Sequence, residues 1–201
     1  PQNERVDVKD ASRISWNRSQ VLRDLRFYSI IPGLVATPFI ITGVLFHQVH
    51  LVETKSWSLT MFASCYPLYA LSATGIMLGT GWVVDRLNAV YLLRFYLLPL
   101  GLGLLLLSCT DKSFVAPIFM ILIGASAGAA TIIMNVLWVE LYGTNYLGSI
   151  RSMCFTMLVI STSIAPGLIG LLIDIGVTLE IQFVILMIYI FVCSIIYIII
   201  T

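Results

Sequence analysis

Six apolar stretches follow one another along the chain and are separated by short polar segments. Each stretch reaches the roughly 20 residues that an α-helix needs to cross the hydrocarbon core of a membrane. A helix satisfies its own backbone hydrogen bonds, so such stretches enter a bilayer as helices. The pattern predicts an all-α membrane protein with six transmembrane helices, at residues 27–50, 58–83, 90–109, 113–141, 146–173 and 179–200.

The residues ahead of the first apolar stretch are polar and basic. Ser19 is a candidate N-cap for a short helix with Val21 and Leu25 on its apolar face. An amphipathic helix of this kind is typical of a segment that lies on a membrane surface. We therefore expect two parts, a linker with a short amphipathic helix over residues 1–26 and a six-helix bundle over residues 27–201.

Composition supports membrane insertion. Hydrophobic residues make up 59% of the 201 residues and charged residues 10%, whereas a soluble domain carries about 25% charged residues. We expect the lipid bilayer as the surroundings and no nucleic-acid partner. The four cysteines stand singly in apolar stretches, without the spacing of metal ligands or of a disulfide framework. We expect neither a metal site nor a cofactor.

Lysine and arginine are unevenly divided between the two sides of the predicted membrane. Only Lys55 and Lys112 of the eleven basic residues lie on the side opposite the N-terminus. Because short cytoplasmic segments carry an excess of basic residues, both termini are expected in the cytoplasm. The location implied is the cell membrane (inner or plasma), crossed several times. The other basic residues are Arg5, Lys9, Arg13, Arg18, Arg23, Arg26, Arg86, Arg94 and Arg151.

The spans differ in polarity with a period of three helices. The third and sixth are almost wholly apolar, as lipid-facing helices are, whereas the other four carry polar residues that should face protein or water. The second span ends Gly81-Trp-Val-Val-Asp85 and the fifth ends Gly170-Leu-Leu-Ile-Asp174, on opposite membrane faces. We interpret this as two inverted three-helix repeats.

Several polar and kinking residues of these four helices are candidates for a site. His47 lies near the outer end of the first span, where it could touch substrate, sense pH or serve only as an interfacial polar residue. Helix kinks are expected at prolines inside spans. The candidate cavity-lining residues are His47, Tyr66, Tyr69, Thr131 and Asn135, and the candidate kinks are Pro38 and Pro166.

The end of the second span carries a recognisable motif. Residues 79–88 read Gly-Thr-Gly-Trp-Val-Val-Asp-Arg-Leu-Asn, which resembles the cytoplasmic loop motif of the major facilitator superfamily. Residues 138–152 are similar to the loop between the tenth and eleventh helices of that family, and Ala165-Pro166-Gly167 is similar to one of its helix patterns. The resemblance covers residues 16–201 and only the second half of a twelve-helix fold.

The resemblance implies a secondary active transporter of small organic solutes that works by alternating access. Its partners would be a small-molecule substrate and an N-terminal six-helix half, on the same or a separate chain, with protons as the candidate coupling ion. No charged residue lies near the middle of a span. A coupling carboxylate would therefore lie in the other half, or the transport is uncoupled.

Four charged residues fall at the predicted cytoplasmic helix ends: Asp85, Arg86, Glu140 and Arg151. We expect Glu140 to pair with Arg86 and Arg151 and so to tie three helix ends together. The resemblance implies that Asp85 closes the cytoplasmic side by contacting a helix N-terminus of the other half. A solvated basic cluster without a gating role is the alternative.

The motif departs from the family pattern after Asp85. Besides Asp85, the motif contains Gly81, Arg86 and Asn88. Asn88 stands where the family has a glycine. Asparagine can still adopt the left-handed conformation of a glycine. The basic pair that should follow is Ala89-Val90, which we expect to weaken the electrostatic closure.

Two other functions remain open. Gly124-Ala-Ser126-Ala-Gly128 resembles the serine motif of rhomboid proteases, which makes an intramembrane serine protease a remote alternative. That chemistry needs a histidine on a later helix, but His47 and His50 both precede the serine, so we expect no enzyme. The closer alternative is a membrane remnant or scaffold that does not transport, because six helices form half of the expected cavity.

Overall fold

The computed structural model describes residues 16–200. Within this range, five helical stretches are long and apolar enough to cross a membrane, and a sixth apolar helix is shorter. The long ones are α3 (Leu25–Phe46), α5 with α6 (Leu59–Ala63 and Tyr66–Val84), α9 (Val115–Tyr142), α10 (Leu147–Asp174) and α11 (Leu179–Ile200). The shorter one is α8 (Leu98–Cys109), and the small helices are α2 (Arg18–Val21), α4 (Gln48–Thr54) and α7 (Ala89–Leu92).

The predicted third span is not one continuous helix. α7 is followed by a turn at 93–97 before α8 begins. Pro99 explains the interruption, because it has no N–H and its ring would clash with the carbonyl of Phe95 in a continuing helix. The next amide, that of Leu100, donates to the buried hydroxyl of Ser126 on α9 at 3.0 Å. The count of six spans holds only when α7, the turn and α8 are taken together, and Ser126 of the protease-like motif serves this junction.

The linker differs from the prediction in its details. Asn17, and not Ser19, caps α2: its side chain accepts from the Gln20 N–H at 3.0 Å, and the Gln20 side chain accepts from the Asn17 N–H at 2.8 Å. This reciprocal arrangement satisfies two free amides at once. The helix is a single turn that ends at Val21, which is buried. Leu25 belongs to the next helix, α3, and is 81% exposed. The predicted linker residues 1–15 lie outside the described residues.

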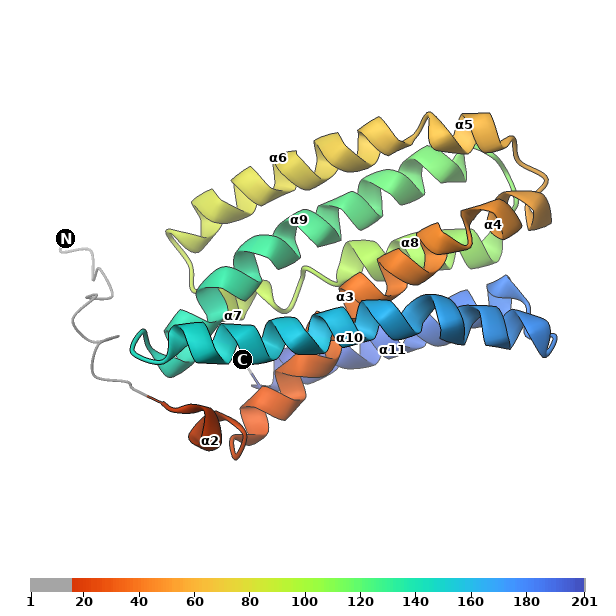
Figure 1. Ribbon diagram of the computed structural model, residues 1–201. Coiled ribbons are helices and arrows are strands. Elements are labelled where there is room, and N and C mark those ends of the chain that lie inside the picture. The colour runs from red at the N-terminus through yellow and green to blue at the C-terminus, as the bar shows by residue number, and fades with distance from the viewer. Residues whose placement is uncertain (1–15, 201) are drawn as a thin grey trace.

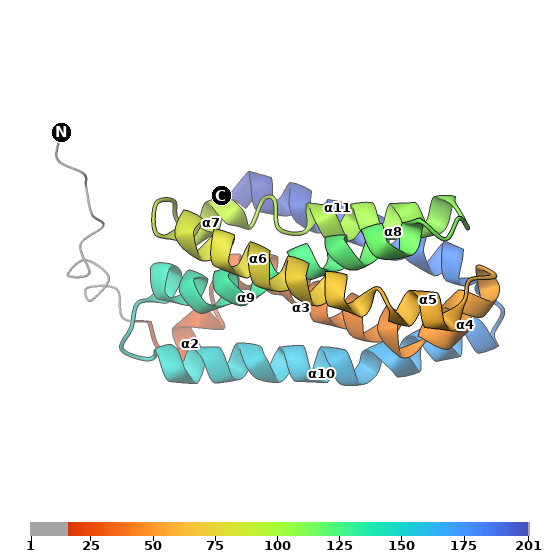
Figure 2. The ribbon, with the colours of Figure 1, turned by 90° about the horizontal axis from the view of Figure 1, so that it is seen from above.

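The long helices pack in pairs that match the predicted repeat. α6 packs on α9 as α10 packs on α3, α8 packs on α9 as α11 packs on α3, and α8 packs on α11. Figures 1 and 2 show these neighbours. The set of pairs stays the same when α3 is exchanged with α9, α6 with α10 and α8 with α11. Two inverted three-helix repeats have this property.

Hydrogen bonds between the helices occur at equivalent positions of the two repeats. The Ser72 hydroxyl on α6 donates to the Ile121 carbonyl on α9 at 2.7 Å, and the Ser161 hydroxyl on α10 donates to the Val35 carbonyl on α3 at 3.2 Å. The two serines are 89 residues apart in sequence, which is also the separation of the aspartates that end the Gly…Asp echo. The predicted inverted repeat is confirmed.

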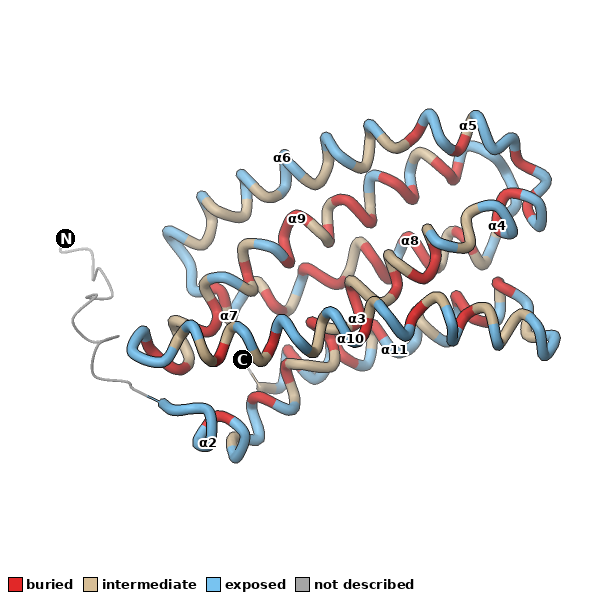
Figure 3. Tube along the Cα trace, in the orientation of Figure 1, coloured by how far each residue is buried: buried red, intermediate tan, exposed pale blue. Residues whose placement is uncertain are grey.

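Burial is uneven among the helices. α3 and α9 contain many of the buried side chains, whereas α6 has no buried residue (Figure 3). The outer side of α6 is an open stripe of apolar and small residues, which we call the α6 stripe. A Cβ atom added at either of its glycines would meet nothing within 4 Å. The α6 stripe consists of Leu71, Gly75, Leu78, Gly79 and Trp82.

The two glycines of α9 have the opposite environment. A Cβ atom on Gly124 would lie 2.5 Å from the Tyr69 carbonyl oxygen, and one on Gly128 would overlap the Ala73 carbonyl oxygen. Small residues at this spacing let helix backbones approach closely in a membrane. Gly124 and Gly128 therefore set the contact between α9 and α6, while the glycines of the α6 stripe contact nothing in the described residues.

Candidate functional site

The bundle has two ends that differ in their charged residues. We call the end at the left of Figure 1 the near end. It holds α2, the α6–α7 connection and the α9–α10 connection, and α11 ends there. The far end holds α4, α5 and the connections that lead from α8 to α9 and from α10 to α11. All four charged residues singled out in the sequence belong to the near end.

Asp85 and Arg86 lie exposed at the end of α6. Asp85 is the C-cap residue of α6, and its carboxylate forms no hydrogen bond or ion pair with another residue of 16–200. The Arg86 guanidinium lies over the Trp82 ring, 4.1 Å from its centroid, an attractive cation–π contact. Gly81, one turn earlier, has open space where a Cβ would be. The motif thus presents one free carboxylate and one stacked guanidinium at the surface.

Glu140 does not form the expected network with the two arginines. Its Oε1 accepts from the Ala89 N–H at 2.9 Å and its Oε2 accepts from the Val90 N–H at 3.4 Å. In the described part of the chain, it forms no ion pair with Arg86 or Arg151. The first amides of a helix have no partner within the helix and attract negative charge. Glu140 therefore caps α7 from α9.

Asn88 does not adopt the left-handed conformation that asparagine permits. Asn88 has φ −66° and ψ 144°, which is extended backbone. This residue is the N-cap of α7, and N-cap residues adopt extended angles. Its own side chain makes no capping hydrogen bond, because the Glu140 carboxylate already occupies that position.

Arg151 turns from the start of α10 toward α9. Its Nη2 donates to the Asn135 carbonyl, and its Nε is buried without a hydrogen-bond partner. The two helices border a cavity of about 310 Å³, which we call the Arg151 cavity. No group of three or more His, Cys, Asp or Glu side chains that could hold a metal ion occurs there or elsewhere in residues 16–200. The residues that line it are Met134, Asn135, Trp138, Arg151, Ser152, Cys154 and Phe155.

The predicted cavity-lining residues of α9 lie on its exposed face. The Thr131 hydroxyl donates to the Ala127 carbonyl at 2.9 Å, and the Asn135 amide donates to the Thr131 carbonyl at 2.8 Å. Asn135 belongs to the Arg151 cavity. Tyr69, on α6, lies beside Gly124 of α9. Gly124 precedes Asn135 by eleven residues, which is roughly 16 Å along α9. Tyr69 and Asn135 therefore lie at different depths along α9.

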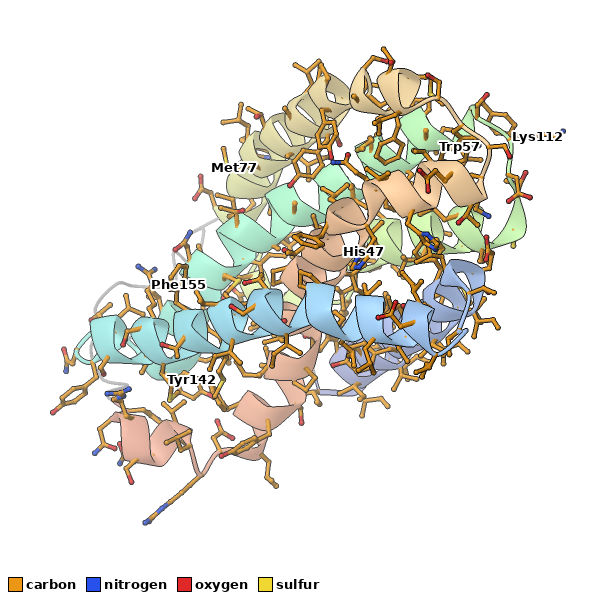
Figure 4. The ribbon with its side chains drawn as sticks, turned by 45° about the vertical axis from the view of Figure 1, so that its right-hand side comes forward. His47, Trp57, Met77, Lys112, Tyr142 and Phe155 are labelled. Carbon is orange, nitrogen blue, oxygen red and sulfur yellow. The ribbon has the colours of Figure 1, made fainter. Side chains whose placement is uncertain are left out.

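Tyr66 and His47 have structural partners toward the far end. The Tyr66 hydroxyl donates to Gln48 Oε1 at 2.7 Å, which joins α6 to α4. His47 Nδ1 lies 2.9 Å from the Gly43 carbonyl oxygen, which can only accept, so this nitrogen carries the hydrogen. Its Nε2 would lie 3.2 Å from a Cβ placed on Gly170, and Figure 4 shows the ring between α3 and α10.

The two candidate kinks lie inside continuous helices. Pro38 is within α3 and Pro166 is within α10, and both helices continue past the proline. Each proline removes one intrahelical hydrogen bond and so weakens the helix at that turn. The kinks themselves stay a prediction.

The far end contains an ion cluster that the sequence analysis missed. The Lys55 side chain is 1% exposed, and its Nζ lies 2.5 Å from Asp111 Oδ1 and 3.1 Å from Glu180 Oε1. We call these three residues the far-end clasp. Trp57 Nε1 donates to the Asp111 backbone carbonyl beside it. Burial alone would lower the pKa of Lys55, but its bonds to the two carboxylates raise that pKa above the ordinary value.

The clasp joins the three connections of the far end. Lys55 follows α4, Asp111 lies between α8 and α9, and Glu180 is in the first turn of α11. A signal was present in the sequence, because one basic residue, Lys55, and two acidic residues, Asp111 and Glu180, lie in or directly beside the three far-end connections. The prediction of membrane orientation counts only Lys and Arg, so it does not reveal the acidic partners of Lys55.

The chain matches a model of a known protein family. A model of the Major Facilitator Superfamily matches residues 1–166. The match includes the Asp85–Arg86 motif, Glu140 and the residues that line the Arg151 cavity. No curated protein matches the chain.

Proposed function

Since this chain belongs to the major facilitator superfamily, we propose that it is the C-terminal half of a secondary active transporter. It is a multi-pass membrane protein, and the proposed activity is the movement of small organic solutes by alternating access. The observation that carries the proposal is the inverted repeat, with its equivalent helix pairs and equivalent serine hydrogen bonds. Transporters use such repeats to expose a central site to each side in turn.

The partner in this proposal is an N-terminal six-helix half, on the same or a separate chain. The α6 stripe supports it, because a membrane helix without buried residues leaves glycines at the spacing that favours close helix contact. The near end faces the cytoplasm in this arrangement, since the basic residues gather there. Protons are the coupling ion that we propose.

Asp85 is the proposed gate residue. Its carboxylate is exposed and unpaired among residues 16–200, so it is available to a helix N-terminus of the other half. Arg86 is held beside it by Trp82. Glu140 fixes the start of α7 directly after the motif, which supports a defined position for the loop.

The test begins with a substrate. The purified protein is screened by thermal shift against metabolites, and the compounds that stabilise it are offered as labelled solutes to proteoliposomes with and without an inward proton gradient. We expect gradient-dependent uptake of at least one compound. Asp85→Asn and Arg86→Ala should each reduce the uptake rate by about tenfold or more, and both variants should still insert into the membrane.

Asp174→Asn is the matched control, because it makes the same chemical change at the equivalent position of the other repeat, at the far end. It should retain more of the uptake rate than Asp85→Asn. Unchanged uptake in both near-end variants would refute the gating role. Absence of uptake for every stabilising compound would refute the transport function and favour the scaffold.

A further inference from the structure

The Arg151 cavity contains a cation whose charge is not neutralised by a carboxylate. The guanidinium uses Nη2 on the Asn135 carbonyl, while its Nε is buried without a partner. A buried donor without a partner costs free energy, so native proteins retain few of them unless a ligand or water completes the bond. The described residues around this cavity therefore offer no acceptor to the Arg151 Nε–H.

The acidic residues of the near end are used elsewhere or lie apart from Arg151. Glu140 caps α7, and Asp24 accepts from the Arg26 amide and the Tyr142 hydroxyl. Asp85 is exposed at the end of α6 and is not paired with Arg151. None of the residues that line the cavity is acidic. The missing acceptor is therefore not among residues 16–200.

We propose that the Arg151 cavity binds the carboxylate of a small amphipathic organic acid. A guanidinium fork matches a carboxylate with two parallel hydrogen bonds, and the one positive charge of the lining suits a monoanion. Met134, Trp138 and Phe155 contact the apolar body of the acid, and the Asn135 amide offers a further donor at the cavity wall. A volume of about 310 Å³ is at the lower end of the range for small-molecule sites.

This inference rests on the proposed function and narrows its substrate class. Sequence position placed Arg151 in a cytoplasmic charge cluster. The structure instead brings its guanidinium to Asn135, seven residues before the end of α9, which is roughly 10 Å inside that helix end. The guanidinium therefore lies roughly 10 Å from the near end along α9, beside the exposed face of that helix, where a solute that enters from the near end would meet it.

The test compares benzoate with benzamide, its neutral analogue of nearly equal size. Binding of radiolabelled benzoate and the shift in melting temperature are measured on the protein as its own gene encodes it, in detergent. Benzoate should bind and stabilise the wild type, and benzamide should do neither. Arg151→Gln should weaken benzoate binding by roughly 10- to 100-fold, and Arg151→Lys by less, because it retains the charge and loses only the fork.

Arg23→Gln is the matched control, since Arg23 is an exposed near-end arginine outside this cavity. It should bind benzoate as the wild type does. Equal stabilisation by benzoate and benzamide would overturn the proposal even if Arg151→Gln fails to fold. Loss of stability in Arg151→Gln without any benzoate binding to the wild type would also overturn it, because Arg151 would then serve a carboxylate of the other half.

The two proposals can fail separately. Uptake of an uncharged solute that is insensitive to Arg151→Gln would preserve the transporter and refute the carboxylate site. Benzoate binding that depends on Arg151, without uptake of any compound, would preserve the site and refute the transporter.

Discussion

The far-end clasp predicts a change in stability whose sign depends on the background in which Lys55 is replaced. Lys55 is almost fully buried, whereas the side chains of Asp111 and Glu180 are 73% and 33% exposed. The two signs of charge therefore differ in what remains after a substitution. Exposed carboxylates regain water, but a buried ammonium group cannot.

The expected magnitudes follow from this difference. Lys55→Met retains most of the apolar stem and loses two charge-assisted bonds, which should cost about 1–2 kcal/mol after allowance for the exposure of the carboxylates. Replacing Asp111 and Glu180 together by alanine leaves the ammonium without a counter-charge, which should cost about 3–5 kcal/mol. Adding Lys55→Met to that double variant removes the unpaired charge and should restore part of the stability.

Thermal unfolding in detergent provides the assay, followed with a thiol-reactive dye. Cys65, Cys154 and Cys193 are buried and become reactive only on unfolding, whereas Cys109 is exposed. The measurements are therefore made in a Cys109→Ser background, which removes the constant signal. Lys112→Met, in the same connection as Asp111, is the matched control and should leave the melting temperature unchanged.

The reasoning is refuted if Lys55→Met lowers the melting temperature by the same amount in the presence and absence of the two carboxylates. Lys55 would then act through the packing of its stem. A double variant that melts at the same temperature as Lys55→Met alone would also contradict the asymmetry, because the buried ammonium would then need no counter-charge.

Three further predictions use the same melting assay. Gly128→Ala should destabilise the protein by about 1–3 kcal/mol through overlap with the α6 backbone. Gly75→Ala, in open space, should be neutral or slightly stabilising in this chain because alanine favours helix. Equal effects of the two substitutions on stability would contradict the assigned packing. Glu140→Ala should cost about 1–3 kcal/mol by leaving two α7 amides without an acceptor, and Glu140→Gln should cost less because its carbonyl still accepts. The pKa of Lys55 is raised on folding, so the stability that its charge provides is complete below the ordinary value of 10.5 and is lost as pH rises through the folded value. The difference in melting temperature between wild type and Lys55→Met should therefore be constant near neutral pH and shrink above about pH 10.5, and a difference that is largest there would reverse the assigned sign.

The helices and their repeat could be predicted because the bilayer constrains sequence at short range. A span must be apolar over its whole length, and equivalent positions of a repeat keep equivalent residues, as the aspartates that end α6 and α10 do. The interruption before α8 was readable in principle from Pro99, but the apolar residues around it continue the hydropathy signal without a gap.

The partners of the charged residues could not be predicted for a different reason. A helix end places a charge at a membrane face but does not determine which other helix end lies beside it. Glu140 was expected to pair with arginines, yet the unpaired amides of α7 lie closer. Arg151 was placed at the surface by its sequence position, but its long side chain extends along the bundle to Asn135. Such choices depend on packing between helices that are distant in sequence.

The buried cation of the far end is neutralised by carboxylates of the chain, whereas no carboxylate of residues 16–200 pairs with Arg151 at the near end. At the far end, Lys55 binds the carboxylate of Asp111, between α8 and α9, and that of Glu180, at the start of α11, so these groups have little left to offer a second bundle. At the near end, Asp85 is unpaired among residues 16–200 and Arg151 retains a buried donor. A rigid half that moves against another needs internal contacts that persist through the motion and external contacts that form in only one state. In the proposed transporter, the clasp would supply contacts that persist and Asp85 a contact that forms in one state, so we propose that the contacts that change between states lie at the near end.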